Sequence, residues 1–434
     1  MSGAASRLAA AEVLTRIITQ RRTLDESLVQ TPSFNALTGS DRGFARAIVS
    51  ATLRQFGRLT LGLDPFLKRS LASADPIVQS LLLTGAAQLW LLGTPTHAAV
   101  GETVSAAKLS QEARKAAGFL NAVLRKASRN QATFEDTPVL GVWPDWLAKT
   151  AAQTLGQKSA EALAHAQTIE PDLHLTVKPG NLDKVIAAFM EAGLAVDRLS
   201  GSSLRVPSGP VSSYPLYGEG CWWVQDIAAA LPAQLLTGGP DRTFLDLCAA
   251  PGGKTMQLAS TGARVLAVDR SAKRLERVAE NLARTKLTDN TELVAEDATS
   301  WRPAIRENID GVLVDAPCSA LGTLRRHPEG AWIKKENDIS SYPTVQKKLL
   351  TAALNLVRPG GQVVYCVCSP FPAEGSAVVE AALETGNFAR IPIKGDEVSL
   401  FKDCITPSGD VLTLPSDVRP AHDAFFIARL TKTS

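Results

Sequence analysis

From about residue 240 onward, short apolar runs alternate with helical stretches, and this alternation constrains the fold more than any other feature of the 434-residue chain. The runs are too short for helices and are typical of buried strands. Helical stretches at 271–286 and 344–357 lie between them, and Ser271 suits the N-cap of the first. The pattern predicts an α/β, Rossmann-like domain with a doubly wound parallel sheet. The expected strands are 243–249, 264–269, 291–297, 311–317, 362–369 and 423–430.

The first 130 residues follow a different rule. Apolar residues recur there at three- and four-residue spacing, with no alternating strand pattern, which predicts an all-helical bundle. Its helices are expected over about 40–57, 75–92, 97–109 and 115–130. A linker over 131–144, a small α+β subdomain over 145–215 and the α/β domain over 216–434 complete the expected organisation.

Composition excludes several protein classes. The six cysteines include no CxxC pair and are too sparse for a disulfide scaffold, so we expect neither a zinc site nor any other metal. No apolar run is long enough to span a membrane and the first residues lack a secretion signal, which favours a cytoplasmic protein with free thiols. The net charge is only +3, but residues 1–145 hold 16 basic and 11 acidic residues. A nucleic-acid partner would therefore meet this part first.

The segment LDLCAAPGGKT (245–255) carries the strongest local signal. It follows the first expected strand, and its glycine pair opens a helix where the backbone can approach a ligand closely. A P-loop would need glycine at the position of Cys248, and the GxGxxG dinucleotide pattern is absent. A loop for a nucleoside-type cofactor remains, with a tight turn that binds nothing as the alternative.

Acidic residues follow the next two expected strands. Asp269 can accept hydrogen bonds from both hydroxyls of a ribose, and Asp297 can accept one from an adenine amino group. Either acid alone could be an ordinary solvated residue. Because ligands of such sheets bind at the carboxyl ends of the strands, the loop and the two acids together predict an adenosine-bearing ligand.

Two cysteines are expected at the same edge of the sheet. Cys318 follows the fourth strand and Cys368 ends the fifth, with Cys366 on the same strand face as Cys368. A buried cysteine is usually inert, but a pair beside a cofactor loop predicts thiol chemistry. We interpret Cys221, Cys248 and Cys404 as inert structural cysteines.

Taken together, these motifs resemble those of the RsmB-like (Sun/Fmu-type) rRNA cytosine-C5 methyltransferase family through essentially the whole chain. The similar segments are QD (225–226), LDLCAAPGGKT, VDR, ED, DAPCSALGTLRRHPE and YCVCSPFPAE. SDRGFARAIVSATLR (40–54) and GFLNAVLRK (118–126) resemble the NusB-type RNA-binding domain of this family. The resemblance implies S-adenosylmethionine as cofactor and a cytosine of small-subunit ribosomal RNA as substrate. We also expect a monomer with no membrane contact.

The resemblance further implies residue roles. Cys368 would add to carbon 6 of cytosine, which activates carbon 5, and Cys318 would assist release of the enzyme from the product. Asp315 would hydrogen-bond the cytosine edge and assist protonation of its ring nitrogen. Lys254 would lie beside cofactor and base, where its charge could lower a thiol pKa. The implied cofactor pocket consists of Cys248, Ala249, Ala250, Pro251, Gly252, Gly253, Lys254, Asp269, Asp297 and Asp315.

The chain departs from the family pattern just before the nucleophile. Val367 stands where the family usually has threonine, and PAEGS (372–376) keeps Glu374 but lacks the later Asn-Glu. Three alternatives stay open. They are a tRNA cytosine methyltransferase on the same scaffold, an RNA-binding ribosome-assembly factor with weak catalysis, which only Val367 favours, and a more distant NAD-linked dehydrogenase.

Basic residues directly follow the Cys318 loop. Arg325, Arg326 and His327 are expected to contact phosphates of the target strand, with a solvated basic loop as the alternative. The target base must be unpaired or flipped out to reach the cysteines. Trp222 and Trp223 are interpreted as core residues rather than base-stacking platforms.

Overall fold

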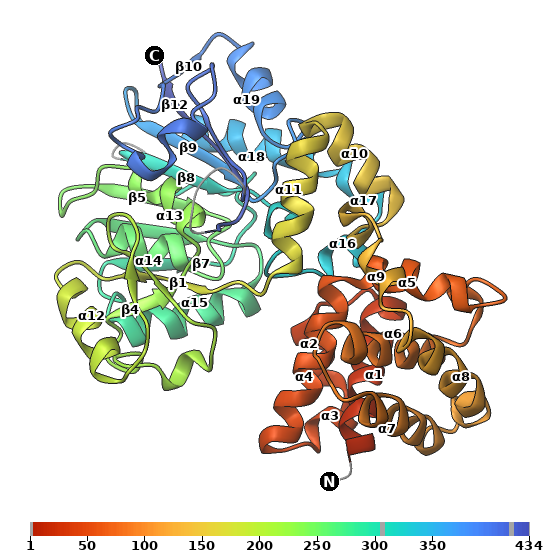
Figure 1. Cartoon of the computed structure of the whole chain (residues 1–434). Helices are drawn as coiled ribbons and strands as arrows, with labels where there is room; N and C mark the ends of the chain where they lie inside the picture. The colour runs from red at the N-terminus through yellow and green to blue at the C-terminus, as the bar shows by residue number, and fades with distance from the viewer. Residues whose placement is uncertain (1–2, 304–308, 416–420, 434) are drawn as a thin grey trace. The chain divides into compact units, whose positions relative to one another are not determined.

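The computed structural model describes residues 3–303, 309–415 and 421–433 (Figure 1). Its chain divides into two compact units. We name residues 1–170 together with 324–336 the helical unit, and residues 171–323 together with 337–434 the α/β unit. The chain therefore leaves the α/β unit after residue 323 and returns to it at residue 337, which a reading of the sequence as successive domains does not anticipate.

The helical unit confirms the predicted all-α bundle. The four helices predicted from spacing are α4 (Gly39–Arg54), α6 (Pro76–Trp90), α7 (Thr96–Leu109) and α8 (Ala117–Ala127). Its other helices are α1 (Gly3–Gln20), α2 (Leu24–Gln30), α3 (Pro32–Asn35), α5 (Phe56–Leu63), α9 (Ala132–Glu135), α10 (Asp145–Leu155), α11 (Gln157–Thr168) and α16 (Gly330–Ile333).

The packing of α1 against α4, α6 and α7 forms the centre of this unit. Ala9, Ala10 and Ala11 of α1 are fully buried, and these small side chains let the neighbouring helices approach closely. Helix α6 is buried on nearly every side, which explains why its sequence is apolar around the whole helix. A capping box formed by Thr23 and Glu26 begins α2.

The boundaries after residue 130 differ from the expected linker and subdomain. Phe134 and Trp143 are buried, so the segment 131–144 is packed rather than free. Helices α10 and α11 belong to the helical unit. Gln167 of α11 explains this, because its side chain accepts a hydrogen bond from Trp143 Nε1 at 2.7 Å and donates one to the Arg54 carbonyl at 3.1 Å.

The α/β unit begins with a small antiparallel sheet in the order β2-β3-β1-β4. Its elements are β1 (Leu173–Val177), α12 (Leu182–Glu191), β2 (Asp197–Arg198), β3 (Ser203–Val206) and β4 (Trp222–Val224). Trp222 and Trp223 are buried, and Trp222 packs in this core with Phe189, as the core interpretation predicted. Since β4 pairs with β1, the small sheet extends past the expected boundary at 215.

The large sheet has the order β10-β12-β9-β8-β5-β6-β7, with β11 paired to β12. Strands β7, β6, β5, β8 and β9 run parallel, as predicted. The last strand pairs antiparallel with β9, so the sheet is mixed rather than all-parallel. The strands are β5 (Thr243–Leu247), β6 (Arg264–Val268), β7 (Thr291–Val294), β8 (Gly311–Asp315), β9 (Gln362–Val367), β10 (Phe388–Arg390), β11 (Val411–Thr413) and β12 (Phe425–Lys432).

Helices cover both faces of this sheet. Alternate residues of β9 enter two different cores: Val364 and Cys366 pack with α13, α14 and α15, while Val363, Tyr365 and Val367 pack with α18 and α19. This alternation is the period of two that a strand covered on both faces requires. The helices are α13 (Ile227–Gln234), α14 (Gly253–Ala259), α15 (Ala272–Thr285), α17 (Glu336–Ile339), α18 (Tyr342–Leu356) and α19 (Ser376–Leu383).

Candidate active site

Strands β8 and β9 bring the two expected cysteines together. These strands are parallel neighbours, with Asp315 opposite Cys366, so their carboxyl ends lie at the same edge of the sheet. Cys318 and Cys368 are half-buried free thiols. Their Sγ atoms lie 3.3 Å apart, which is close enough for one thiol to donate a hydrogen bond to the other.

Main-chain contacts hold the two cysteine loops against each other. Ala316 N donates to Cys366 O at 3.0 Å, and Gly322 N donates to Cys368 O at 2.9 Å. A side chain at Gly322 would place its Cβ 2.1 Å from the carbonyl oxygen of Ala424. Glycine is therefore required there for the loop after Cys318 to approach the end of β9.

Lys254 and Asp315 form an ion pair beside the cysteines. Lys254, the second residue of α14, donates from Nζ to Asp315 Oδ2 at 2.8 Å, and Cys366 Sγ donates to Asp315 Oδ1 at 3.4 Å. The Lys254 ammonium also lies 5.3 Å from the centre of the Phe425 ring. Burial lowers the pKa of Lys254, but Asp315, Cys366 and Asp246 together outweigh burial and raise the pKa overall, so the ammonium stays charged.

The side chain of Cys368 is a thiol rather than a thiolate. The hydrogen bond with Cys318, in which the protonated Cys368 thiol is the donor, and then burial raise the pKa of Cys368 well above its ordinary value, although the Lys254 charge lowers it. Burial likewise raises the pKa of Cys366. The expected influence of Lys254 is therefore present but too small to give a thiolate at neutral pH, because the desolvated site disfavours a negative charge on sulfur.

The loop from Cys248 to Gly252 joins β5 to α14. Cys248 and Gly252 both have positive φ, +66° and +102°. Cys248 N and Ala249 N donate to Val268 O, which holds the loop against the end of β6. A Cβ at Gly252 would lie 3.1 Å from Val278, so the loop packs closely on α15. Small side chains at positions 249, 250, 252 and 253 leave the backbone open to close approach by a ligand.

The two expected ligand-binding acids lie at the ends of the next strands. Asp269 follows β6 with its side chain nearly fully buried, and it pairs with Arg274 at 3.1 Å. Its carboxylate also accepts a hydrogen bond from Ala250 N, so Asp269 holds the loop between β5 and α14 in place. Asp297 lies three residues beyond the end of β7, on an exposed turn. Hydrogen bonds from the Thr299 hydroxyl and backbone lower the pKa of Asp297, so it is a ready acceptor.

Asp246 is a residue that our reading of the sequence missed. It lies inside β5 and is fully buried, and its Oδ2 accepts a hydrogen bond from Thr255 Oγ1 at 2.6 Å. Among the described residues its Oδ1 has no hydrogen-bond partner. Burial raises the pKa of Asp246 to about 7. The available signal was an acid in the middle of an otherwise apolar strand.

The expected RNA-contacting residues lie in the helical unit. Arg325 is buried, and its carbonyl accepts from Arg54 Nη1 at 2.6 Å, so its position does not support a phosphate contact. Arg326 is half-buried, while His327 is exposed with Nδ1 3.8 Å from Glu329 Oε1. Burial raises the pKa of Glu329, but the neighbouring His327 and backbone hydrogen bonds, including the one from Leu24 N, outweigh burial and lower the pKa overall.

The residues present fit an adenosine-bearing cofactor. The open loop 248–253 and the carboxylates of Asp269 and Asp297 supply the close backbone approach and the acceptors that a nucleoside needs, at the carboxyl ends of β5, β6 and β7. Within the described ranges, no group of three His, Cys, Asp or Glu side chains is arranged to hold a metal ion, and no helix is long and apolar enough to cross a membrane. The fold and loop define a Rossmann-like, S-adenosylmethionine-dependent methyltransferase.

Known proteins narrow this class. Residues 233–431 match the model of the 16S rRNA methyltransferase RsmB/F family, and residues 4–129 match the NusB family. Ribosomal RNA small subunit methyltransferase B of Pseudomonas putida is 36% identical over 98% of both chains, and that of Xanthomonas campestris is 34% identical over 88% of both. The chain belongs to the 16S rRNA methyltransferase RsmB/F family.

Solved structures support the fold. The crystal structure of PH0851 has a TM-score of 0.79 at 22% identity and covers 100% of this chain and 99% of its own. NSun6 from Pyrococcus horikoshii, solved with SFG, has a TM-score of 0.58 at 19% identity and covers 67% of this chain and 98% of its own. At these identities the likeness establishes architecture only.

Proposed function

We propose that this protein methylates carbon 5 of a cytosine in small-subunit ribosomal RNA through a covalent cysteine adduct. The observation that carries the proposal is the pair of free thiols, 3.3 Å apart, at the ends of adjacent strands beside the Lys254–Asp315 ion pair. Methylation of an exocyclic nitrogen or a ribose oxygen needs no nucleophilic thiol. Carbon 5 of cytosine does, because it is a poor nucleophile until a group adds to carbon 6.

The side chains can be assigned to steps. The sulfur of Cys368 forms a bond to carbon 6 as its thiol proton leaves, while Asp315 assists protonation of the ring nitrogen. When bound, S-adenosylmethionine supplies the electrophilic methyl group that carbon 5 then takes up. Cys318, 3.3 Å from Cys368, assists loss of the carbon-5 proton and breaking of the bond between sulfur and carbon 6. The ring nitrogen then loses its added proton and the released Cys368 thiolate takes up a proton, so the thiol is regenerated and the base carries one methyl group in place of one hydrogen.

Lys254 holds the acid in position for this chemistry. Its ammonium is bound to Asp315 Oδ2 and is nearly buried, which leaves Oδ1 beside Cys366. About a third of the Asp315 side chain is exposed, so it can still meet a base edge. We infer that the pair keeps a carboxyl oxygen directed at the cytosine and keeps a positive charge near the sulfur as negative charge develops there.

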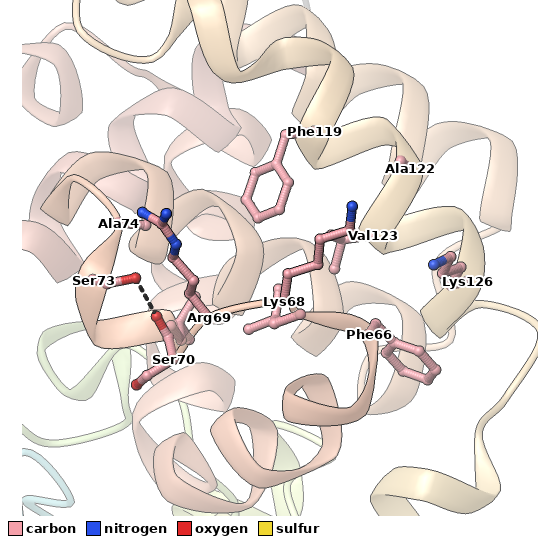
Figure 2. Close-up of a pocket in the computed structure, with 12 residues that line it drawn as sticks. Phe66, Lys68, Arg69, Ser70, Ser73, Ala74, Phe119, Ala122, Val123 and Lys126 are labelled. Carbon is pink, nitrogen blue, oxygen red and sulfur yellow. Dashed lines mark hydrogen bonds between the residues drawn. The ribbon is translucent and has the colours of Figure 1, made fainter.

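The helical unit offers a surface suited to RNA. A cavity of about 450 Å³ is lined by Phe66, Lys68, Arg69, Phe119 and Lys126 together with small apolar and serine residues (Figure 2). In Figure 2, Lys68 extends from the loop after η1 (Asp64–Phe66) towards α8, which carries Phe119 and Lys126. None of the described residues that line this cavity is acidic. Cations suit phosphates and exposed rings suit bases, which supports RNA as the partner.

Transfer of a labelled methyl group tests this function. The purified protein is incubated with labelled S-adenosylmethionine and either total rRNA or tRNA from a strain that lacks the gene, followed by nucleoside analysis. We expect label in 5-methylcytosine of the small-subunit rRNA. Label in tRNA instead would overturn the substrate assignment. Label in another nucleoside would overturn the chemistry, and no label in either RNA would favour an RNA-binding assembly factor.

A further inference from the structure

A buried glutamate links the two cysteine loops. Glu374 is fully buried and lies after β9. Its Oε1 accepts hydrogen bonds from Ser319 Oγ at 2.5 Å and Ser369 Oγ at 2.7 Å. Its Oε2 accepts from Ser319 N at 2.7 Å and from Gln346 Nε2 at 3.2 Å. A buried carboxylate is costly unless its oxygens are satisfied, and here four donors satisfy them.

Three of these four hydrogen bonds come from the residues that directly follow the two cysteines. Ser319 follows Cys318, and Ser369 follows Cys368. One carboxylate therefore bridges the two loops at their reactive ends, and bonds to a charged acceptor are roughly twice as strong as neutral ones. The contacts are not those of an acid that merely fills space in the core.

The contacts of Gln346 and Tyr365 complete this bridge. Gln346 Nε2 also donates to Pro317 O at 3.0 Å, so Cys318 is held through the residue before it and the residue after it. Tyr365 of β9 donates from its hydroxyl to the Glu374 carbonyl at 2.6 Å, which fixes the glutamate to the strand that delivers Cys368. The bridge therefore runs from one cysteine loop to the sheet that supports the other.

We propose that Glu374 is a positioning residue that sets the separation between the Cys318 and Cys368 thiols. Its catalytic consequence rests on the proposed function, in which one sulfur acts at carbon 6 and the other at the adjacent carbon 5. Two groups that act on neighbouring atoms must keep a fixed spacing, and a displacement of about 1 Å can lower a rate about 100-fold.

Binding of phenylarsine oxide measures the thiol spacing without RNA or cofactor. Two close thiols displace the oxygen of one arsenic as water, so tight binding requires both sulfurs within reach of one atom. We expect Glu374→Gln to weaken binding about tenfold or more, because the amide nitrogen meets donors that need an acceptor. Ser369→Ala, which removes one donor, should weaken it less. Cys318→Ala gives the binding expected of a single thiol, and Glu380→Gln, at an exposed position of α19, is the matched control.

Turnover separates positioning from a general loss of structure. We expect Glu374→Gln to lower kcat about 100-fold, with the KM for RNA and the Kd for S-adenosylmethionine within about twofold of wild type. Where Glu374→Gln fails to fold, Ser319→Ala and Ser369→Ala carry the test. Unchanged arsenical binding in folded variants would overturn the positioning role. Weakened arsenical binding in a protein whose wild type methylates no RNA would uphold that role and refute the proposed function.

Discussion

Single residues divide the chemistry between two thiols that look alike in sequence. Cys368 directly follows β9, the parallel neighbour of the strand that carries Asp315, and the proposed mechanism makes Cys368 the nucleophile. We expect Cys368→Ala to abolish methyl transfer and to form no covalent adduct with RNA, while S-adenosylmethionine binding stays within about twofold, because the cofactor loop does not depend on this side chain. Calorimetry and transfer assays on the same preparation check this. Full turnover by the variant would refute the mechanism.

Cys318 is expected to act after the adduct has formed. Its sulfur lies 3.3 Å from the nucleophile but on the other strand's loop. In Cys318→Ala the first step should proceed while release stalls, so that a protein–RNA species stable to denaturing electrophoresis accumulates during turnover. Cys404→Ala, a buried cysteine outside the site, serves as the control and should show none. If Cys318→Ala turns over normally with no trapped species, Cys318 has no role in release.

The raised pKa of Cys368 sets the pH dependence. Because the hydrogen bond that the Cys368 thiol shares with Cys318, together with burial, raises this pKa, the reactive thiolate becomes more abundant as the pH rises towards the pKa. The single-turnover rate should therefore increase about tenfold per pH unit between roughly pH 6 and 8. Lys254 lowers the Cys368 pKa, so Lys254→Met should move the profile to higher pH. A rate that is flat over this range would show that the thiol is already ionised.

At the scale of elements, strand β5 holds a fully buried acid, Asp246. Burial raises the pKa of Asp246 to about 7, above its value in an unfolded chain, so the folded state favours the protonated acid. The contribution of Asp246 to the free energy of unfolding is fully present below about pH 4 and is lost as the pH rises to about 7. The variant Asp246→Asn keeps an acceptor for Thr255 but does not titrate. Compared with this variant, the wild type should lose about 2 kcal/mol of its free energy of unfolding between about pH 5 and pH 7. Denaturant unfolding at both pH values measures this difference, and a pH-independent difference would contradict the shift.

The same strand shows what a sequence can predict. Apolar runs and their spacing predicted β5, β6, β7, β8 and β9 and their parallel order, because a strand covered on both faces must be apolar throughout. The antiparallel pairing of β12 could not be read in this way, since β12 has the same apolar pattern as its parallel neighbours. The partners of Glu374 also escaped prediction, because they depend on how loops more than 50 residues apart meet.

At the scale of the whole molecule, the loop that follows Cys318 continues directly into the segment of chain that joins the α/β unit to the helical unit. The chain leaves the α/β unit after residue 323, and the next 13 residues belong to the helical unit, where Glu329 accepts a hydrogen bond from Leu24 N and the ring of Trp332 packs on Phe56. No hydrophobic pattern distinguishes the segment 324–336 from an ordinary loop. For this reason the sequence predicts that its basic residues contact the target strand near the active site. The covalent path from Cys318 into the helical unit is therefore only a few residues long.

We expect the helical unit to bind RNA and the α/β unit to carry out the methyl transfer. If the cavity of Figure 2 holds RNA, loss of its cations should weaken RNA binding without affecting chemistry in the α/β unit. We expect Lys68→Gln combined with Lys126→Gln to raise the KM for RNA about tenfold, with kcat unchanged, and to reduce the salt dependence of RNA binding. Phe119, 43% exposed, tests base stacking, since Phe119→Leu keeps an apolar side chain but removes the ring.

Lys108→Gln, an exposed cation on α7 that does not line the cavity, is the control. Equal effects of the cavity and control variants would indicate diffuse electrostatic attraction. A fall in kcat with an unchanged KM would show that the cavity residues act on the active site and do not grip the RNA.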